Sequence, residues 1–103
     1  MKRTVIITGA NRGIGRASVK AFAEHGFDLW ACARTPSGAF EADMAEEAAR
    51  TGAAITPVYF DLLNEAEIQR GVKEILSEKR DVDVLLNCAG IPHGGLLTMT
   101  SLE

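Results

Sequence analysis

A glycine-rich segment near the start of the chain has the residue types and spacing of an anion-binding turn. Its glycines, Gly9, Gly13 and Gly15, follow the pattern G-x-x-x-G-x-G. Glycine lets a chain that leaves a strand turn sharply and bring its backbone close to a pyrophosphate, and the N–H groups that open the next helix then face the anion. The spacing differs from G-x-G-x-x-G, and no Gly-Lys-Ser/Thr follows as in a P-loop. Taken alone, the pattern is also compatible with a simple tight turn.

Arg34 is a second candidate for ligand recognition. It stands about 20 residues past the glycines, where folds that bind an unphosphorylated adenosine ribose usually carry an acid. Asp28 is acidic, but it opens the preceding strand and belongs to the opposite edge of the sheet. A guanidinium pairs with a 2′-phosphate through charge-assisted hydrogen bonds, whereas a carboxylate repels it. Arg34 therefore predicts NADP(H) in preference to NAD(H), and a solvated loop charge is the alternative.

The elements that position these residues alternate along the chain. Short apolar runs predict strands at 4–8, 27–33, 54–60 and 82–86, and helical periodicity predicts helices at 14–25 and 40–50 and from residue 64 onward. This order predicts a parallel sheet with right-handed crossovers, which binds ligands at the carboxyl ends of its strands. The glycine segment lies at such an end, which favours nucleotide binding over a simple turn.

Several residues make these expectations more specific. Pro57 predicts that the third strand is an edge strand or contains a bulge. Asn64 and Glu67 predict a capping box at the start of the third helix. The apolar stripes expected to face the sheet are Ile14, Ala17, Ala21 and Phe22 in the first helix, and Ile68, Val72, Ile75 and Leu76 in the third.

Three motifs together resemble those of the short-chain dehydrogenase/reductase family, over almost the whole chain. They are Thr8-Gly-x-x-x-Gly-Ile-Gly15, Asp61-Leu62 after the third strand, and Asn87-x-Ala-Gly90 after the fourth. The resemblance implies an α/β fold, a Rossmann-type doubly wound parallel sheet, with residues 1–103 as its N-terminal half and strand order 3-2-1-4. It also implies an oxidoreductase that interconverts a carbonyl and an alcohol by hydride transfer.

The resemblance further implies which residues bind the cofactor. The pyrophosphate and adenosine ribose would be lined by Gly9, Asn11, Gly13, Ile14 and Gly15. Arg12 would point to the same phosphate as Arg34. Asp61 would accept a hydrogen bond from the adenine amino group, with Leu62 beside the ring. The central part of the cofactor would be held by Asn87, Ala89 and Gly90. Cys88 departs from the family, which usually has a second Asn there.

The acid that must protonate the forming alkoxide is missing from this sequence. In the family it is a tyrosine, with a lysine four residues later and a serine nearby. The only tyrosine in this sequence is Tyr59, and the residue four positions later is Leu63, not a lysine. We therefore expect no catalytic residue, an inactive and marginally stable segment, and a catalytic half beyond Glu103. The T-x-x-E box at 100–103 predicts a further helix. A nucleotide-binding module without chemistry is the alternative, and a methyltransferase is disfavoured because Arg34 replaces the acid it would need.

Composition limits the remaining classes. The chain has 103 residues, 47% hydrophobic residues and a net charge of −3, which exclude a disordered chain and give no basic footprint for nucleic acid. No apolar run suits a membrane span or a signal peptide. Cys32 and Cys88 predict reduced thiols in a cytoplasmic protein. We expect a small carbonyl or alcohol substrate, no nucleic-acid or membrane partner, and a homo-oligomer at full length.

Other polar residues are expected to have ordinary roles. His25 should cap the first helix, and His93 should be a loop residue, although the resemblance places it near the nicotinamide. The acidic residues at the start of the second helix complement its dipole and are too dispersed to bind a metal; they are Glu41, Asp43, Glu46 and Glu47.

Overall fold

The protein is described from a computed structural model, over residues 3–78 and 81–88. Over these residues, strands and helices alternate in the predicted order, and most element ends lie within two residues of those predicted. The elements are β1 (Thr4–Thr8), α1 (Gly13–Glu24), β2 (Asp28–Ala33), α2 (Gly38–Thr51), β3 (Ile55–Tyr59), α3 (Glu65–Ser77) and β4 (Val84–Asn87). None of the helices in the described part is long and apolar enough to cross a membrane.

Within the described residues, the strands form one parallel sheet in the order β3-β2-β1-β4, which confirms the predicted order. β3 lies at an edge of this sheet, which is one of the two alternatives, an edge or a bulge, that Pro57 predicted. Proline has no N–H to donate, so it is tolerated where one side of the strand has no partner to bind. Pro57 is aligned with Ala31 of β2.

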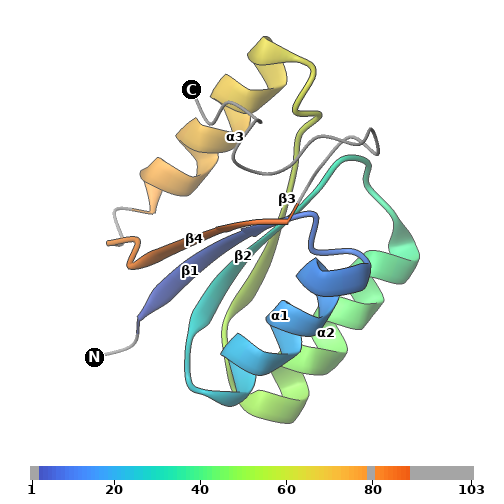
Figure 1. Ribbon diagram of the computed structural model, residues 1–103, viewed down its shortest axis with the longest axis vertical. Coiled ribbons are helices and arrows are strands. Elements are labelled where there is room, and N and C mark those ends of the chain that lie inside the picture. The colour runs from blue at the N-terminus through green and yellow to red at the C-terminus, as the bar shows by residue number, and fades with distance from the viewer. Residues whose placement is uncertain (1–2, 79–80, 89–103) are drawn as a thin grey trace.

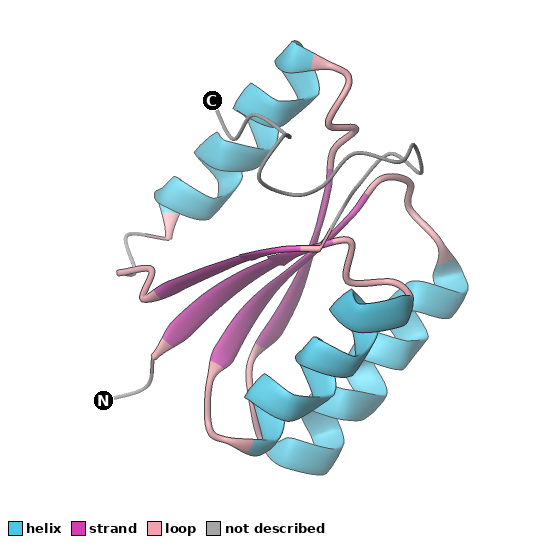
Figure 2. Cartoon of the chain, viewed as in Figure 1, coloured by secondary structure: helices cyan, strands magenta, loops and turns pink. Residues whose placement is uncertain are grey.

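Helices cover both faces of the sheet. α1 and α2 lie on one face and α3 lies on the other (Figures 1 and 2). Side chains alternate along β2 accordingly. Leu29, Ala31 and Ala33 belong to the core on the α1 and α2 side, whereas Trp30 and Cys32 pack with Ile75 of α3. Burial on both faces explains why β2 is apolar at nearly every position.

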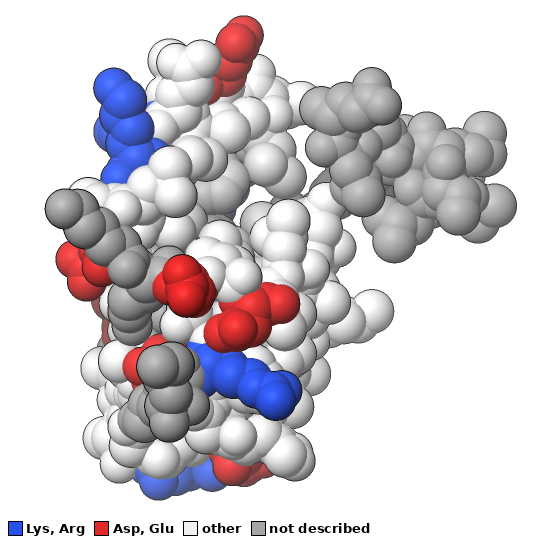
Figure 3. Space-filling model, turned by 90° about the vertical axis from the view of Figure 1, so that its left-hand side faces the viewer, with Lys and Arg blue, Asp and Glu red and all other residues white. Residues whose placement is uncertain are grey.

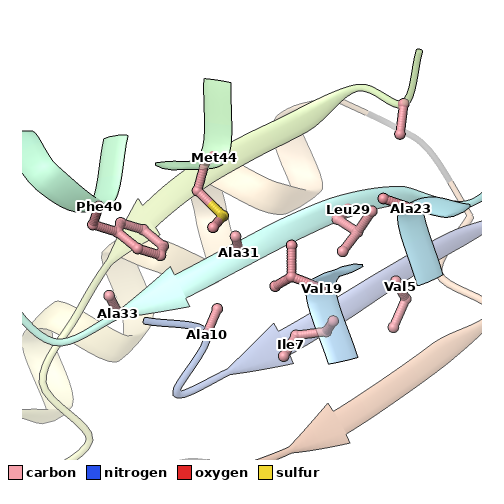
Figure 4. Packing of buried hydrophobic residues seen from close by; sticks show 11 residues of the cluster. Val5, Ile7, Ala10, Val19, Ala23, Leu29, Ala31, Ala33, Phe40 and Met44 are labelled. Carbon is pink, nitrogen blue, oxygen red and sulfur yellow. The ribbon is translucent and has the colours of Figure 1, made fainter. Parts of the chain in front are cut away.

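The buried face of α1 differs from the predicted one. Gly15, Val19 and Ala23, four residues apart, are buried, whereas Ile14 is 77% exposed and Ala17 and Ala21 are exposed too. Figure 4 shows Val19 and Ala23 over Val5, Ile7 and Leu29. The prediction was wrong because it treated Gly15 as part of the turn, when its small size lets the helix approach the sheet closely. Phe22 is half-buried and packs edge-on against Phe27.

The stripe predicted for α3 is only partly correct. Ile75 is buried and Ile68 is half-buried, but Val72 and Leu76 are 45% and 65% exposed. The helix instead approaches the sheet at Gly71, where an added Cβ would lie 2.6 Å from the Phe60 ring. The Phe60 ring thus fills the space at Gly71 that an apolar side chain of α3 would otherwise occupy.

The predicted caps are present with one change. Gly52 ends α2 with φ of 79°, and Asn64 Oδ1 accepts a hydrogen bond from Glu67 N at 3.1 Å. A reciprocal capping box would have Glu67 accept from the N–H of Asn64. Glu67 Oε1 instead accepts a hydrogen bond from Asp61 N at 3.0 Å, which connects the start of α3 to the end of β3. Ser37 caps α2, accepting from Phe40 N at 3.3 Å.

An ion-pair network joins α1 to α2. Arg16 donates to both carboxylate oxygens of Asp43 and to Glu47 Oε2 at 2.6 Å, and Arg50 binds Glu47 Oε1 and Glu24. Hydrogen bonds from Arg16 and Arg50 lower the pKa of the Glu47 carboxyl. Two of the acidic residues assigned to the helix dipole therefore bind an arginine of the neighbouring helix. Elsewhere the charges are mixed, with acidic and basic side chains interspersed on the face in Figure 3.

Candidate cofactor-binding site

The carboxyl ends of the strands bring the predicted site segments to one edge of the sheet. Thr8 of β1 is aligned with Asn87 of β4, and Ala33 of β2 is aligned with Tyr59 of β3. The loops that follow β1, β2 and β3 lie at the same end of the sheet (Figure 1). The glycine loop, Arg34 and Asp61 are on these loops. Asp28 lies at the opposite edge, where its carboxylate accepts a hydrogen bond from Ala54 N.

The glycine loop has the backbone geometry that its glycines suggested. Gly9 and Gly13 have φ values of 63° and 61°, which side-chain-bearing residues rarely adopt. Gly15 is needed for space, because an added Cβ would lie 1.9 Å from the carbonyl oxygen of Gly9. The loop is also bonded to β2, since Ala10 N donates to Cys32 O at 2.9 Å. The first turn of α1 is thus held directly against the loop.

The N-terminus of α1 is suited to an anion. Arg12 occupies the N-cap position in an extended conformation and makes no side-chain cap, and the first turn carries no acidic residue. By contrast, α2 and α3 are capped by Ser37 and Asn64. The free N–H groups and the positive end of the helix dipole are left for a ligand. The surrounding loop is accessible, with Asn11, Arg12, Gly13 and Ile14 all exposed.

Arg34 and Asp61 form an ion pair across the ends of β2 and β3. Arg34 Nε lies 3.3 Å from Asp61 Oδ2, and the Arg34 side chain is 73% exposed. The other carboxylate oxygen of Asp61 accepts a hydrogen bond from Leu63 N at 2.9 Å. Leu62, beside it, is 45% exposed. The sequence prediction gave these two charged residues separate roles and missed their contact, because 27 positions separate them and no local pattern links them.

Thr8 connects the glycine loop to the end of β4. Its hydroxyl donates to Asn87 Oδ1 at 2.7 Å and accepts from Cys88 N at 3.1 Å. Sequence reasoning included Thr8 only as the first letter of a motif and did not predict this bridge. The remaining predicted residues Ala89 and Gly90, as well as His93 and the box at 100–103, lie outside the described residues.

Other reactive side chains have structural partners. The Tyr59 hydroxyl donates to Glu41 Oε2 at 2.7 Å, and partial burial together with this bond raises its pKa to about 12. Burial raises the pKa of the Cys32 thiol to about 12, and both cysteines are free. His25 is the C-cap of α1, with Nδ1 2.7 Å from Ala21 O, as expected. Over residues 3–78 and 81–88, no cluster of His, Cys, Asp or Glu is placed to hold a metal.

Comparison with known proteins gives a consistent result. Residues 3–103 match the family model of the short chain dehydrogenases. The chain is 36% identical over 101 residues to a 3-oxoacyl-[acyl-carrier-protein] reductase of Synechocystis, covering 98% of this chain and 40% of that protein. It is 37% identical over 105 residues to a short-chain dehydrogenase/reductase of Hericium erinaceus, covering 99% of this chain and 41% of that protein. The chain therefore spans about two fifths of the length of these relatives.

Solved structures have the same fold. A short-chain dehydrogenase from Sphingobium yanoikuyae in complex with NADPH matches with a TM-score of 0.73 and 29% identity, covering 97% of this chain and 39% of that chain. L-sorbose reductase from Gluconobacter frateurii, complexed with NADPH and L-sorbose, matches with a TM-score of 0.81, covering 97% of this chain and 38% of that chain. Its identity of 22% supports the fold alone.

Proposed function

The chain belongs to the short-chain dehydrogenase family, and on that premise we propose that it is the N-terminal, cofactor-binding part of a longer Rossmann domain that prefers NADP(H). The proposal depends chiefly on one observation: α1 has an uncapped N-terminus behind the glycine loop, next to a loop that carries Arg34. Two features that would bind phosphate then lie at one edge of the sheet. The family members that match in sequence and structure include reductases, and one at 29% identity binds NADPH.

The pyrophosphate would lie against the glycine loop. Gly9 and Gly13 give the backbone its turn, and Gly15 lets the first turn of α1 lie close behind it. The free N–H groups of that turn would donate to the phosphate oxygens. Asn11 and Ile14 are exposed beside this position and would line the ribose.

The adenosine end would lie across the ends of β2 and β3. Arg34, together with Arg12, would pair with the 2′-phosphate, because a guanidinium binds phosphate through charge-assisted hydrogen bonds. Asp61 would accept from the adenine amino group, and the exposed side chain of Leu62 would pack beside the ring. At the other end of the site, Asn87 would hold the central part of the cofactor, as would Ala89 and Gly90.

We propose that the whole protein interconverts a carbonyl and an alcohol of small size. The nicotinamide, when bound, would supply or accept the hydride. The proton donor would come from outside these 103 residues, since the sequence has no Tyr-x-x-x-Lys and Tyr59 binds Glu41. We accordingly propose that this segment alone is inactive. As a separate proposal from the sequence, the full-length protein is a cytoplasmic homo-oligomer.

Cofactor preference can be tested by measuring the dissociation constants of NADPH and NADH for the parent and for Arg34→Asp. A charged hydrogen bond contributes about 1.5–3 kcal/mol, so we expect the parent to favour NADPH by about 10- to 150-fold. Arg34→Asp should abolish or reverse that preference. Lys73→Asp, at an exposed position of α3, makes the same change in net charge and should leave the preference intact. An unchanged preference in Arg34→Asp would refute the role of Arg34.

A nucleotide-binding module without chemistry is the second candidate, and the absence of Tyr-x-x-x-Lys from the sequence favours it for these residues alone. The two candidates differ in turnover and not in cofactor binding. Consumption of NADPH with a panel of small ketones, followed by absorbance at the nicotinamide band, distinguishes them. Turnover by the full-length protein supports the reductase, whereas tight NADPH binding without turnover supports the module.

A further inference from the structure

We propose that Asp61 is a positioning residue for cofactor specificity, which holds Arg34 in the orientation that binds a 2′-phosphate. This inference rests on the proposed NADP(H) preference. It adds Asp61 to Arg34 as a residue on which that preference depends. Asp61 would then have two roles at one carboxylate, one toward the adenine ring and one toward Arg34. The first role is implied by family resemblance, and the second follows from the contact in this structure.

The contact involves the nitrogen of Arg34 that is nearest the main chain. Nε lies 3.3 Å from Asp61 Oδ2, and none of the described residues forms a hydrogen bond with the two terminal nitrogens. The Arg34 side chain is 73% exposed, so those nitrogens are accessible to a ligand. A guanidinium held at Nε can still present its terminal N–H groups to a phosphate. The ion pair therefore orients Arg34 without occupying its ligand-binding end.

Asp61 is itself held more firmly than Arg34. Its Oδ1 accepts from Leu63 N at 2.9 Å, its carbonyl accepts from Asn64 N at 2.9 Å, and its N–H donates to Glu67 Oε1 at 3.0 Å. Its side chain is 26% exposed, about a third of the value for Arg34. A carboxylate with its main chain and one oxygen already bonded can restrict a long, exposed side chain whose rotamers are otherwise free.

The negative charge of Asp61 also has an opposing effect, because it repels a phosphate. That repulsion acts over a longer distance than the attraction between the phosphate and the intervening guanidinium, and Coulomb energy falls with distance. The ion pair acts at 3.3 Å on the orientation of Arg34. We infer that orientation outweighs repulsion, and that loss of the carboxylate lowers selectivity for the 2′-phosphate.

The test uses two nucleotides that differ only in the 2′-phosphate, adenosine 5′-monophosphate and adenosine 2′,5′-bisphosphate. Their dissociation constants are measured by calorimetry at 0.15 M salt for the parent, Asp61→Asn and Asp61→Ala. We take the ratio of the dissociation constant of the monophosphate to that of the bisphosphate, so that a high ratio means preference for the 2′-phosphate. This ratio isolates the 2′-phosphate, because any loss of the adenine contact affects both ligands equally. We expect Asp61→Ala to lower this ratio by about 2- to 5-fold, the range of exposed ion pairs. Asp61→Asn keeps an acceptor for Leu63 N and should lower the ratio less.

Two further variants serve as controls. Glu65→Gln removes an exposed carboxylate from the first turn of α3 and should leave the ratio unchanged. In an Arg34→Ala background there is no cation to position, so Asp61→Asn should no longer lower the ratio. This comparison keeps the proposal testable if Asp61→Ala does not fold.

Each outcome distinguishes the inference from the proposed function. A ratio that is the same in the parent and all Asp61 variants would limit Asp61 to the adenine contact and overturn the inference. A ratio that rises in both variants would show that repulsion dominates and would overturn it as well. If the parent binds both nucleotides equally, the NADP(H) preference itself fails.

Discussion

Replacing Gly15 by alanine should damage both stability and cofactor binding, although the change adds a single methyl group. An ideal Cβ at this position would lie 1.9 Å from the carbonyl oxygen of Gly9, 2.7 Å from its carbonyl carbon and 3.3 Å from Ala10 Cα. The atoms it meets are backbone, so no side-chain rotation relieves the contact. The loop or the start of α1 must move by about 1 Å or more to reach ordinary packing distances.

Two effects of opposite sign determine the size of the change. Alanine is favoured over glycine inside a helix by up to about 1 kcal/mol. Overpacking in a filled site costs about 1–3 kcal/mol, and a contact with rigid backbone belongs at the upper end of that range. We therefore expect a net loss of about 1–2 kcal/mol in the free energy of unfolding. The same shift would displace the N–H groups proposed to donate to the pyrophosphate, and loss of one hydrogen bond to a charged group costs about 1.5–3 kcal/mol, so we expect NADPH affinity to fall about 10-fold or more.

Urea unfolding, followed by far-UV circular dichroism and by the fluorescence of buried Trp30, measures the first effect, and NADPH titration measures the second. Gly38→Ala is the matched control. Gly38 is also a helical glycine, but a Cβ there would meet nothing within 4 Å. This variant should be neutral or slightly more stable, by up to about 1 kcal/mol. If Gly15→Ala were as stable as Gly38→Ala and bound NADPH as the parent does, the close contact between α1 and the glycine loop would be refuted.

Two further predictions concern ionisable side chains. The pKa of Glu47 is lowered from its ordinary value of 4.5 by its arginine partners, so its stabilising effect is present above that value and is lost as pH falls below it. Glu47→Gln should cost about 1–3 kcal/mol at pH 7 and flatten the fall in unfolding free energy between pH 6 and 3, whereas Glu46→Gln, at an exposed position, should change neither. The single tyrosine should ionise near pH 12 in an ultraviolet absorbance titration. Glu41→Gln should bring that transition closer to 10, and a parent transition already at 10 would contradict the bond between Tyr59 and Glu41.

The fold was predictable because its signals are local and agree with one another. Strands buried on both faces are apolar at most positions, and turn residues such as Gly52 and Asn64 mark where helices end and begin. Pro57 limited β3 to an edge position or a bulge by a backbone argument that needs no tertiary information. The exposed Ile14 shows where this reasoning fails. Periodicity selects the largest apolar residues, whereas close packing of α1 on the sheet selects the smallest, Gly15 and Ala23.

The site was predictable in its segments and not in its contacts. A glycine loop and the ends of parallel strands can be located from the order of elements. The ion pair of Arg34 with Asp61 and the bonds of Arg16 to Asp43 and Glu47 join residues 27 to 31 positions apart. Those contacts depend on which loops become neighbours and on side-chain rotamers, and no pattern in the intervening sequence encodes either.

The bond from Ala10 N to Cys32 O has a consequence for how cofactor preference could evolve. It joins the glycine loop to β2 through main-chain atoms alone, two residues before Arg34. Substitutions of the Arg34 side chain therefore leave the carbonyl that supports the loop in place. On the proposed function, the architecture would separate a constant part, which turns the chain around the pyrophosphate, from a replaceable side chain that distinguishes one cofactor from another. If Arg34 selects the cofactor as proposed, exchange of this single residue would be an accessible mutational route between the two nicotinamide cofactors.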